Sequence, residues 1–392
     1  MSDFINIEGV KKTIFGSGSI NQVGSECKRL GVSRVLLVMD RALAKTDMSV
    51  TIQELLRKNR IRSFLYSDIT PEPDPMLADM GTEFAKKEKV RCVIGVGGGS
   101  TMDVAKAISI LATNAGKAVD YIGLDTVKRA GLPAIMIPTT AGTGSETTFT
   151  SVFTMRDTKS KGGINSPFLY PRVAILDPLL TLDLPPFVTA YTGMDALTHA
   201  IESFTSLQAH FLSEPISLRA MKQIVDNLRG AVYHGSDIQY RSNMMTGSYL
   251  AGLGLSMAGV GAVHALAYPL GAFFDVPHGI ANGLLLPYVL EYNYPGNMDK
   301  FRRIAVAMGQ EVEGLSPREA ASLAAESVFD LAEDIGTPLT LKELSIPEDS
   351  IKKMAEAAMK VERPMANNPR PMTVETAEEI YRRAFEGESK MH

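Results

Sequence analysis

The residues best suited to chemistry in this sequence are one aspartate and three histidines in its second half. Asp195 and His199 are four residues apart in the helical pattern GMDALTHAIESF. That spacing places a carboxylate and an imidazole on one face of a helix, one turn apart. His264 lies in the uncharged run VGAVHALAYPL, and His278 follows in the turn DVPHGIAN. An imidazole among apolar neighbours is stable only if its nitrogens are satisfied, and metal ligation would satisfy them.

Any one of these histidines, taken singly, is better explained as a hydrogen-bonded core residue. Together with Asp195 they predict a centre for one divalent cation. Three imidazoles and one carboxylate suit Zn²⁺ or Fe²⁺, and ligand type alone does not decide between them. Four protein ligands leave a further position for an alcohol or aldehyde oxygen. We therefore expect a Lewis-acid role for the cation.

A glycine-rich turn in the first half predicts a phosphate-binding site. The apolar run CVIGV leads directly into Gly97, Gly98, Gly99 and Ser100, and a helical pattern begins at about Thr101. Glycines let the backbone approach an anion closely, and a helix start offers unpaired N–H groups and the positive end of its dipole. The pattern is neither a P-loop nor the standard dinucleotide motif. A tight turn without a ligand would also require glycine.

Two further features favour a nucleotide at this turn. Asp40 follows the apolar run RVLLVM, where a carboxylate can bind the ribose of NAD and would repel the 2′-phosphate of NADP. A helix cap is the alternative role for Asp40. Residues 138–146, PTTAGTGSE, concentrate hydroxyl groups and glycines. Thr139, Thr140 and Thr143 are expected to bind a diphosphate or ribose, unless the segment is only a structural loop.

The elements that must position these residues change in kind along the chain. Four short apolar runs predict buried strands, and helical patterns lie between them. The predicted strands are 34–39, 92–96, 134–137 and 173–176, and the predicted helices are 19–30, 76–88 and 101–112. Such alternation predicts a parallel sheet with helices on both faces. After Asp177 only helical patterns remain, so we expect an α/β dinucleotide-binding domain over 1–184 and an all-α metal-binding domain over 185–392.

The bulk composition excludes several classes of protein. The chain has 392 residues, 45% of them hydrophobic, which suits two globular domains. A net charge of −4 and the lack of a Lys/Arg cluster argue against a nucleic-acid partner. The two cysteines, Cys27 and Cys92, allow neither a disulfide framework nor a cysteine-rich zinc site, and we expect buried thiols.

One uncharged stretch has the length of a membrane span. Residues 250–274 contain no Asp, Glu, Lys or Arg, which meets the length criterion for crossing a bilayer. The stretch also contains His264, Pro269 and five glycines, and it lacks basic residues at its ends. We therefore expect a buried helical segment. The first twelve residues lack the apolar core of a secretory signal, so we expect a cytoplasmic protein with no membrane partner.

Four motifs, in their order and spacing, resemble the iron-containing alcohol dehydrogenases. They are GVGGGSTMDVAKAI, PTTAGTGSETT, GMDALTHAIESF and HALAYPLGAFFDVPHG, and VAILDP, LPP and ANNPRP extend the resemblance over nearly the whole chain. The general form is similar to the lactaldehyde reductase and 1,3-propanediol dehydrogenase branch. The resemblance implies a Rossmann-like N-terminal domain and a helical C-terminal domain, as in dehydroquinate synthase. It also implies NAD, Fe²⁺ with Zn²⁺ as the alternative, and a homodimer or larger homo-oligomer.

The resemblance also assigns roles to individual positions. The family's metal ligands fall on Asp195, His199, His264 and His278. Its cofactor-binding positions fall on Asp40, Glu72, Gly97, Gly98, Gly99, Ser100, Thr139, Thr140, Thr143 and Lys161. Its substrate-pocket positions fall on Phe149, Thr150, Leu255 and Tyr268.

Tyr268 departs from the family pattern, because many relatives carry a histidine there that is suspected in proton transfer. A tyrosine hydroxyl donates and accepts hydrogen bonds, but its reference pKa of about 10 suits a neutral proton relay poorly. Tyr268 is therefore a candidate catalytic residue with a competing interpretation, in which it only shapes the pocket.

Two alternative functions remain open. The scaffold also resembles dehydroquinate synthase and the glycerol dehydrogenases, which likewise join a nicotinamide to a metal. A lyase acting on a phosphorylated carboxylate requires several Lys and Arg residues at its pocket. The motifs around the predicted metal ligands are mostly uncharged, which favours a small primary alcohol or aldehyde, although Lys159, Lys161 and Arg370 leave an anionic substrate open. The other alternative is a metal- and nucleotide-binding protein without turnover.

Overall fold

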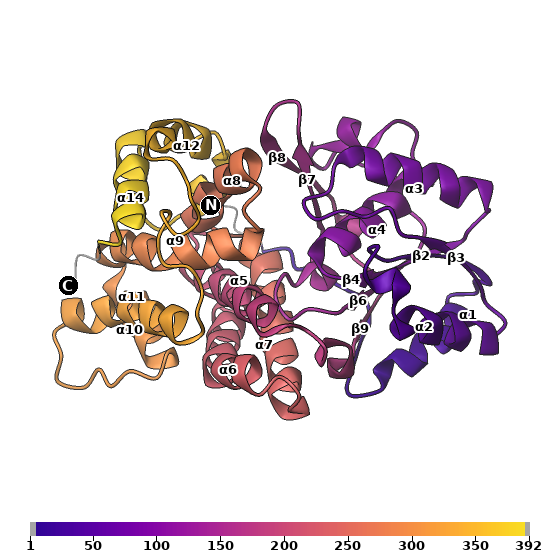
Figure 1. Cartoon of the computed structure of the whole chain (residues 1–392), viewed down its shortest axis with the longest axis horizontal. Helices are drawn as coiled ribbons and strands as arrows, with labels where there is room; N and C mark the ends of the chain where they lie inside the picture. Colours follow the sequence, from indigo (N-terminus) through magenta and orange to yellow (C-terminus); the bar gives the residue numbers. More distant parts are fainter. Residues whose placement is uncertain (1–4, 389–392) are drawn as a thin grey trace. The chain divides into compact units, whose positions relative to one another are not determined.

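The structure is a computed structural model that describes residues 5–388. The described chain divides into two compact units (Figure 1), one made of residues up to 140 together with 144–182, the other of 141–143 together with the residues from 183 onward. The first unit contains a parallel sheet with helices, and the second is helical. In the described part of the chain, every strand precedes Asp177. The predicted fold class, an α/β N-terminal domain followed by an all-α C-terminal domain, is confirmed.

A six-stranded sheet forms the centre of the first unit. Its order is β1-β9-β6-β4-β2-β3, and all neighbouring strands are parallel. The strands are β1 (Thr13–Phe15), β2 (Arg34–Val38), β3 (Arg62–Tyr66), β4 (Cys92–Gly97), β6 (Ala134–Pro138) and β9 (Val173–Leu176). The four inner strands are the four that the sequence predicts. Their near-continuous apolar runs follow from burial on both faces of a parallel sheet.

Helices cover both faces of this sheet. They are α1 (Val23–Arg29), α2 (Asp47–Lys58), α3 (Pro75–Lys87) and α4 (Gly99–Leu111). Alternate residues of β2 belong to two separate apolar clusters, because successive side chains of a strand point to opposite faces. Val35 and Leu37 belong to the cluster that contains Leu56 of α2, whereas Leu36 and Val38 belong to the cluster that contains Ile108 of α4. The predicted helix 19–30 is a short 3₁₀ helix (Ser19–Gln22) followed by α1.

A second, smaller sheet of the first unit is not predicted from the sequence. It has the order β5-β8-β7 and consists of β5 (Gly123–Leu124), β7 (Thr150–Met155) and β8 (Ser160–Asn165). Strands β7 and β8 form an antiparallel hairpin. Both cysteines lie in the main part of this unit and are buried, as predicted. Burial raises the pKa of the Cys27 thiol to about 12, so this thiol stays protonated near neutral pH.

The second unit is a set of helices around one apolar core. They are α5 (Pro186–Thr205), α6 (Ser213–Tyr233), α7 (Ile238–Ala258), α8 (Ala262–Phe274), α9 (His278–Asn293), α10 (Met298–Ala307), α11 (Pro317–Asp334), α12 (Ile351–Ala358), α13 (Glu362–Asn367) and α14 (Val374–Glu386). Helix α5 is buried along most of its length and packs against α6, α7 and α9. A glycine allows the close approach of α6, because a Cβ on Gly193 would lie 2.2 Å from Leu228 Cδ1.

The uncharged stretch 250–274 is divided between two helices. Helices α7 and α8 meet at a bend of 104°, where Gly259 has a φ of +73°. No single helix among the described residues is long and apolar enough to span a membrane, and only this bent pair passes a test of length and composition. The stretch is helical and mostly buried or half-buried, as expected.

Candidate active site

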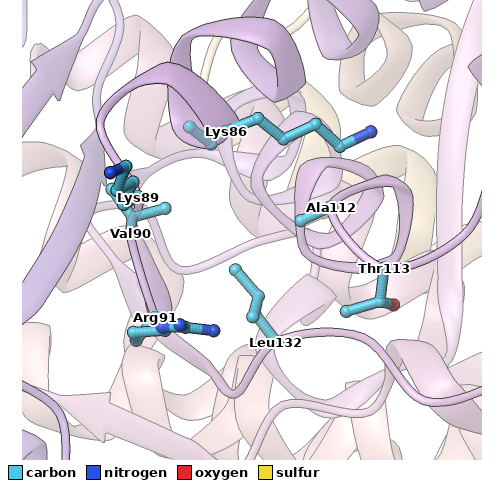
Figure 2. A pocket seen from close by; sticks show the side chains of 8 residues that line it. Lys86, Lys89, Val90, Arg91, Ala112, Thr113 and Leu132 are labelled. Atoms are coloured by element: carbon cyan, nitrogen blue, oxygen red, sulfur yellow. The ribbon is translucent and has the colours of Figure 1, made fainter.

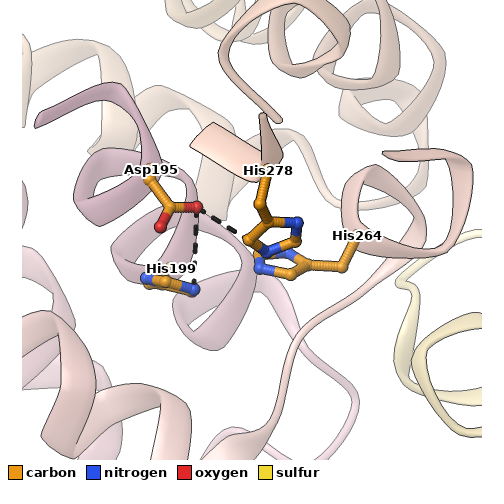
Figure 3. A group of neighbouring side chains, drawn as sticks. All are labelled: Asp195, His199, His264 and His278. Carbon is orange, nitrogen blue, oxygen red and sulfur yellow. Dashed lines mark ion pairs between the residues drawn. The ribbon is translucent and has the colours of Figure 1, made fainter. Parts of the chain in front are cut away.

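The four predicted metal ligands come together within the second unit. Helix α5 supplies Asp195 and His199, α8 supplies His264, and α9 begins with His278. One ligand atom from each lies within 4.8 Å of all the others. Figure 3 shows the four side chains pointing toward one another, with Asp195 Oδ1 3.9 Å from Nε2 of both His199 and His278. Three of the four are buried and His278 is partly exposed.

Local backbone geometry brings the ligands from separate helices together. The bend at Gly259 ends α7 and turns the chain into α8, which carries His264. Asp275 ends α8 in the left-handed region, with a φ of +54°, and the chain then starts α9 at His278. A Cβ on Gly279 would lie 2.6 Å from the carbonyl oxygen of Tyr191 on α5. The absence of a side chain at position 279 therefore lets the start of α9 approach α5 closely.

Two buried polar residues that the sequence did not indicate contact the ligands. Asn282, one turn after His278 on α9, donates from Nδ2 to Asp195 Oδ1 at 2.7 Å. The same nitrogen lies 3.1 Å from His278 Nε2 and 3.2 Å from His264 Nε2. Glu202 on α5 places Oε2 2.6 Å from His264 Nδ1. Glu202 and Asn282 lie one turn after predicted ligands on the same helices, which is the only sequence signal that could have found them.

The charges at the site suit metal ligation. Burial would raise the pKa of Asp195, but the three histidines and the Asn282 amide together hold it below its usual value. Burial is the main reason that the pKa of His199 is lowered. Asp195 is therefore ionised and His199 neutral near pH 7, the protonation states that metal ligands require. The donor set, three imidazoles and one carboxylate in a buried cluster, fits Zn²⁺ or Fe²⁺.

The predicted pocket residues belong to both units. Tyr268 lies one turn after His264 on α8, and its ring centroid is 6.0 Å from that of His278. Leu255 is half-buried on α7. Phe149 and Thr150 belong to the first unit, where the Phe149 ring contacts Tyr170. The structure thus places Tyr268 beside the candidate metal centre.

The glycine turn of the first unit has the geometry of a tight strand-to-helix connection. Gly97 has a φ of +153°, and a Cβ there would lie 2.7 Å from Thr101 Oγ1. Helix α4 begins at Gly99, two residues earlier than predicted, with Gly98 as its N-cap. Because Gly98 has no side chain, the cap leaves the first N–H groups of α4 without the side-chain acceptor that an Asp or Ser cap would provide.

Two predicted threonines lie beside this turn, at the carboxyl end of the neighbouring strand β6. Thr139 donates its backbone N–H to the Gly97 carbonyl at 3.1 Å, and a Cβ on Gly98 would lie 3.7 Å from Thr140. The Thr140 hydroxyl is buried and has no hydrogen-bond partner among the described residues, a condition that a bound polar ligand would relieve. Thr143 belongs to the second unit.

Asp40 follows β2, which neighbours β4 in the sheet. Its Oδ1 accepts the backbone N–H groups of Ala42 and Leu43 at 2.8 and 2.9 Å. The structure therefore shows the capping role that the sequence left open. It also places Asp40 at the carboxyl end of its strand, the edge of an α/β sheet where ligands bind.

Glu72 and Lys161, assigned separately to the cofactor by resemblance, form an ion pair in the structure. Lys161 Nζ lies 2.5 Å from Glu72 Oε2, and the Thr154 hydroxyl donates to the same oxygen at 3.3 Å. The Lys161 side chain is only 3% exposed. The pair joins β8 to the segment that precedes α3.

A buried lysine that the sequence did not indicate holds residues 145–150, which continue from the threonine- and glycine-rich segment 138–146. Lys106 of α4 is fully buried, and its ammonium donates to Ser145 O and Thr148 Oγ1 at 3.1 Å and to the Thr150 carbonyl. It also pairs with Asp103 at 3.1 Å. Asp103 accepts the Ser145 hydroxyl at 2.6 Å, so two residues of α4 fix residues 145–150.

A hollow of about 290 Å³ lies at the other end of β4 (Figure 2). It is lined by Ala85, Lys86, Lys89, Val90, Arg91, Ala112, Thr113 and Leu132. These residues precede β4 or follow α4, so the hollow lies at the amino end of the strand. Ligands of open α/β sheets bind at the carboxyl ends of the strands, which is where the glycine turn lies.

The chain belongs to the iron-containing alcohol dehydrogenase family. Residues 11–178 match the family description "iron-containing alcohol dehydrogenase", and residues 189–385 match "Fe-containing alcohol dehydrogenase family, C-terminal". The protein is therefore an oxidoreductase of the metal-dependent alcohol dehydrogenases and aldehyde reductases.

Characterised relatives cover nearly all of the chain. It is 40% identical to long-chain-alcohol dehydrogenase 1 of Geobacillus thermodenitrificans, over 95% of this chain and 94% of the relative. It is 40% identical to 1,3-propanediol dehydrogenase of Citrobacter freundii, over 95% and 96%. It is 35% identical to lactaldehyde reductase of Escherichia coli, over 95% and 97%. The predicted similarity to the lactaldehyde reductase and propanediol dehydrogenase branch is confirmed.

Solved structures share the fold over the same length. A structure of 1,3-propanediol oxidoreductase has a TM-score of 0.95 and 37% sequence identity, over 97% of this chain and 100% of the other. A sulfoacetaldehyde reductase from Bifidobacterium kashiwanohense, in complex with NAD⁺, has a TM-score of 0.87 and 28% identity, over 97% and 98%.

Proposed function

We propose that the protein transfers a hydride reversibly between NAD(H) and a small, neutral primary alcohol or aldehyde at a bound divalent cation. The observation that carries this proposal is the buried convergence of Asp195, His199, His264 and His278, whose ligand atoms lie within 4.8 Å of one another. Fe²⁺ is the proposed cation, as the family name suggests, and Zn²⁺ is the alternative. Asp195, His199, His264 and His278 would hold it.

The residues around the cation have distinct tasks in this proposal. When bound, the cation supplies Lewis-acid polarisation of the substrate oxygen. Asp195 provides the one negative charge among the four ligands, and Asn282 orients its Oδ1 through the 2.7 Å hydrogen bond. Tyr268, whose ring lies 6.0 Å from the His278 ring, limits the space beside the ligands.

The proposed cofactor site is the turn between β4 and α4. The α/β domain, 1–184, would bind NAD through Gly97 to Ser100, Thr139 and Thr140, while 185–392 would carry the metal. The unpartnered Thr140 hydroxyl and the side-chain-free cap of α4 favour a phosphate there. NAD⁺ in the complex of the related sulfoacetaldehyde reductase supports this choice of cofactor. A homodimer or larger homo-oligomer is part of the same proposal.

The proposed substrate is neutral because the helix beside the metal ligands is uncharged. Helix α8, which carries His264 and Tyr268, contains no Asp, Glu, Lys or Arg. A charged substrate buried against such a helix would lack a partner for its charge. Short aldehydes with a hydroxyl or alkyl group fit this surface better than acidic semialdehydes.

Removing the charge of Asp40 is expected to relax the preference for NADH over NADPH. Asp40→Asn keeps an oxygen that can accept the N–H groups of Ala42 and Leu43, so it retains the cap while removing the repulsion of a 2′-phosphate. Asp40→Gly removes both. We expect both variants to raise kcat/KM for NADPH relative to NADH by about tenfold or more, equivalent to about 1.4 kcal/mol. An unchanged ratio in both variants would leave Asp40 with its capping role alone.

The substrate proposal is tested by NADH oxidation with anaerobically purified, Fe²⁺-loaded protein. The panel contains lactaldehyde, glycolaldehyde, butyraldehyde and an acidic semialdehyde of similar length. The proposal predicts turnover of the neutral aldehydes, and the best of them shows whether the pocket prefers a hydroxyl or an alkyl chain. A clear preference for the acidic semialdehyde would contradict the neutral-substrate proposal. Metal binding without turnover of any aldehyde, with NADH or NADPH, would contradict the reductase proposal itself.

A further inference from the structure

We propose that Glu202 is a positioning residue of the metal centre, which fixes His264 in the tautomer that presents a bare Nε2 to the cation. Glu202 lies on α5, three residues after His199, and its side chain is buried. The inference rests on the proposed metal centre and concerns how one ligand is prepared for it.

The contacts of Glu202 determine where the proton of His264 lies. Glu202 Oε2 is 2.6 Å from His264 Nδ1, and Oε1 accepts the backbone N–H of Val263 at 2.6 Å. A carboxylate in its ionised form only accepts hydrogen bonds, and with Glu202 in that form the contact places the proton on Nδ1. In a neutral imidazole the other nitrogen, Nε2, then has the lone pair that a metal ligand needs.

The opposite side of the His264 ring is consistent with that tautomer. Asn282 Nδ2 lies 3.2 Å from His264 Nε2 and 2.7 Å from Asp195 Oδ1. Because Nδ2 donates to Asp195 Oδ1, the amide nitrogen of Asn282, not its oxygen, lies on this side. The amide nitrogen of Asn282 therefore faces Nε2, with its two hydrogens shared among Asp195 Oδ1, His264 Nε2 and His278 Nε2, an arrangement consistent with an unprotonated His264 Nε2.

The placement of Glu202 is itself held by a buried polar network. A Cβ on Gly261 would lie 3.1 Å from Glu202 Oε1 and 3.2 Å from Asn368 Oδ1, so glycine leaves room for both side chains. Asn368 accepts the Ala262 N–H at 3.3 Å and exchanges hydrogen bonds with Asn293. The first N–H groups of α8 thus bind two buried side chains from other segments, which sets the position of His264 against α5.

A buried carboxylate that hydrogen-bonds a metal-ligating histidine contributes to protein stability and to metal affinity. These two contributions can be measured separately. Such partners fix the tautomer and orientation of the ligand ring, and their mutation typically lowers metal affinity by about 10–100-fold. A purely structural Glu202 would instead affect stability without a specific effect on metal affinity.

The test is Glu202→Gln, with Zn²⁺ affinity measured by competition with a chelator. Glutamine has nearly the same shape, and its oxygen can still accept the Val263 N–H. Its NH₂ group then faces His264 Nδ1, which favours the tautomer with a proton on Nε2. We expect Zn²⁺ affinity to fall about 10–100-fold, while the Tm of the metal-stripped variant stays near that of wild type.

Glu214→Gln is the matched control. Glu214 lies on α6 in the same unit and pairs with Lys300 at 3.0 Å, so this variant also loses a carboxylate contact. It contacts none of the four metal ligands, and we expect wild-type Zn²⁺ affinity. Equal Zn²⁺ affinity in wild type, Glu202→Gln and Glu214→Gln would overturn the role of Glu202 while leaving the metal centre intact. Failure of the wild-type protein to bind either Zn²⁺ or Fe²⁺ would overturn the proposed metal centre itself, and with it the proposed role of Glu202.

A second measurement does not depend on the folding of Glu202→Gln. ¹⁵N NMR of wild-type protein with labelled histidine, assigned by comparison with a His264→Gln sample, reports which ring nitrogen of His264 carries the proton. We expect His264 Nδ1 to be protonated and His264 Nε2 to be unprotonated in the metal-stripped protein. A proton on Nε2 in the metal-stripped protein would overturn the proposal.

Discussion

Replacing His264 by alanine is expected to abolish both aldehyde reduction and metal retention while NADH binding persists. His264 is buried on α8 and supplies one of four converging ligand atoms. Its loss leaves three ligands, and Glu202 loses the histidine that it contacts at 2.6 Å. Because Lewis-acid polarisation is worth several kcal/mol of barrier, we expect turnover to fall at least about 10³-fold.

The measurement for His264→Ala combines metal content after gel filtration, kcat for the best aldehyde, and NADH affinity by fluorescence. His234→Ala is the control, because His234 lies at the exposed end of α6 and is not among the clustered ligands. We expect the control to keep its metal and its activity. Turnover at the wild-type rate in His264→Ala would contradict the assignment of the metal site. Loss of NADH affinity together with metal would mean that the two sites are not separable.

Replacing Lys106 by methionine is expected to destabilise the first unit strongly. The Lys106 ammonium is fully buried and donates to Ser145 O, Thr148 Oγ1 and the Thr150 carbonyl. Methionine fills much of the same volume but leaves two buried carbonyls without this donor and Asp103 without its cation. Removing one partner of a buried ion pair costs about 3–5 kcal/mol, and we expect a loss of that size in the free energy of unfolding.

Thermal unfolding measures the effect of Lys106→Met, with a fall in Tm of about 2–4 °C for each kcal/mol in a unit of this size. Lys222→Met is the control, because the Lys222–Asp226 pair, at 3.0 Å, is largely exposed and should contribute less than about 1 kcal/mol. We also expect weaker NADH binding in Lys106→Met, since Lys106 holds residues 145–150, which follow the proposed cofactor residues Thr139 and Thr140 in the chain. Equal stability of the two variants would show that the buried network contributes little.

The sequence predicts the centre of the fold better than its edges. The four inner strands are continuous apolar runs, because both of their faces are covered. Strand β3, RSFLY, is partly exposed, and β8, SKGGIN, is polar and contains two glycines, so neither has the composition of a buried strand. Helix α4 begins two residues before the expected start, because Gly99 and Ser100 continue the turn as helix.

The metal ligands are predictable from the sequence, whereas the residues that support them are not. Asp195 and His199 share a helix, so their spacing alone places them on one face, and an imidazole in the uncharged helix α8 is conspicuous. Glu202 and Asn282 act on residues from other helices. Their role depends on which helices pack together, which is a tertiary property. The same holds for Glu72 and Lys161, whose ion pair joins segments far apart in the sequence.

The most direct test of the central claim is the metal dependence of NADH oxidation. Protein stripped of metal by a chelator is assayed with the neutral aldehydes, then reloaded anaerobically with Fe²⁺ or, separately, Zn²⁺ and assayed again, with bound metal measured in each sample. The account predicts negligible turnover in the stripped protein and recovery on reloading, in proportion to about one cation per chain. Full turnover by the stripped protein, or metal bound equally well by His264→Ala, would contradict it.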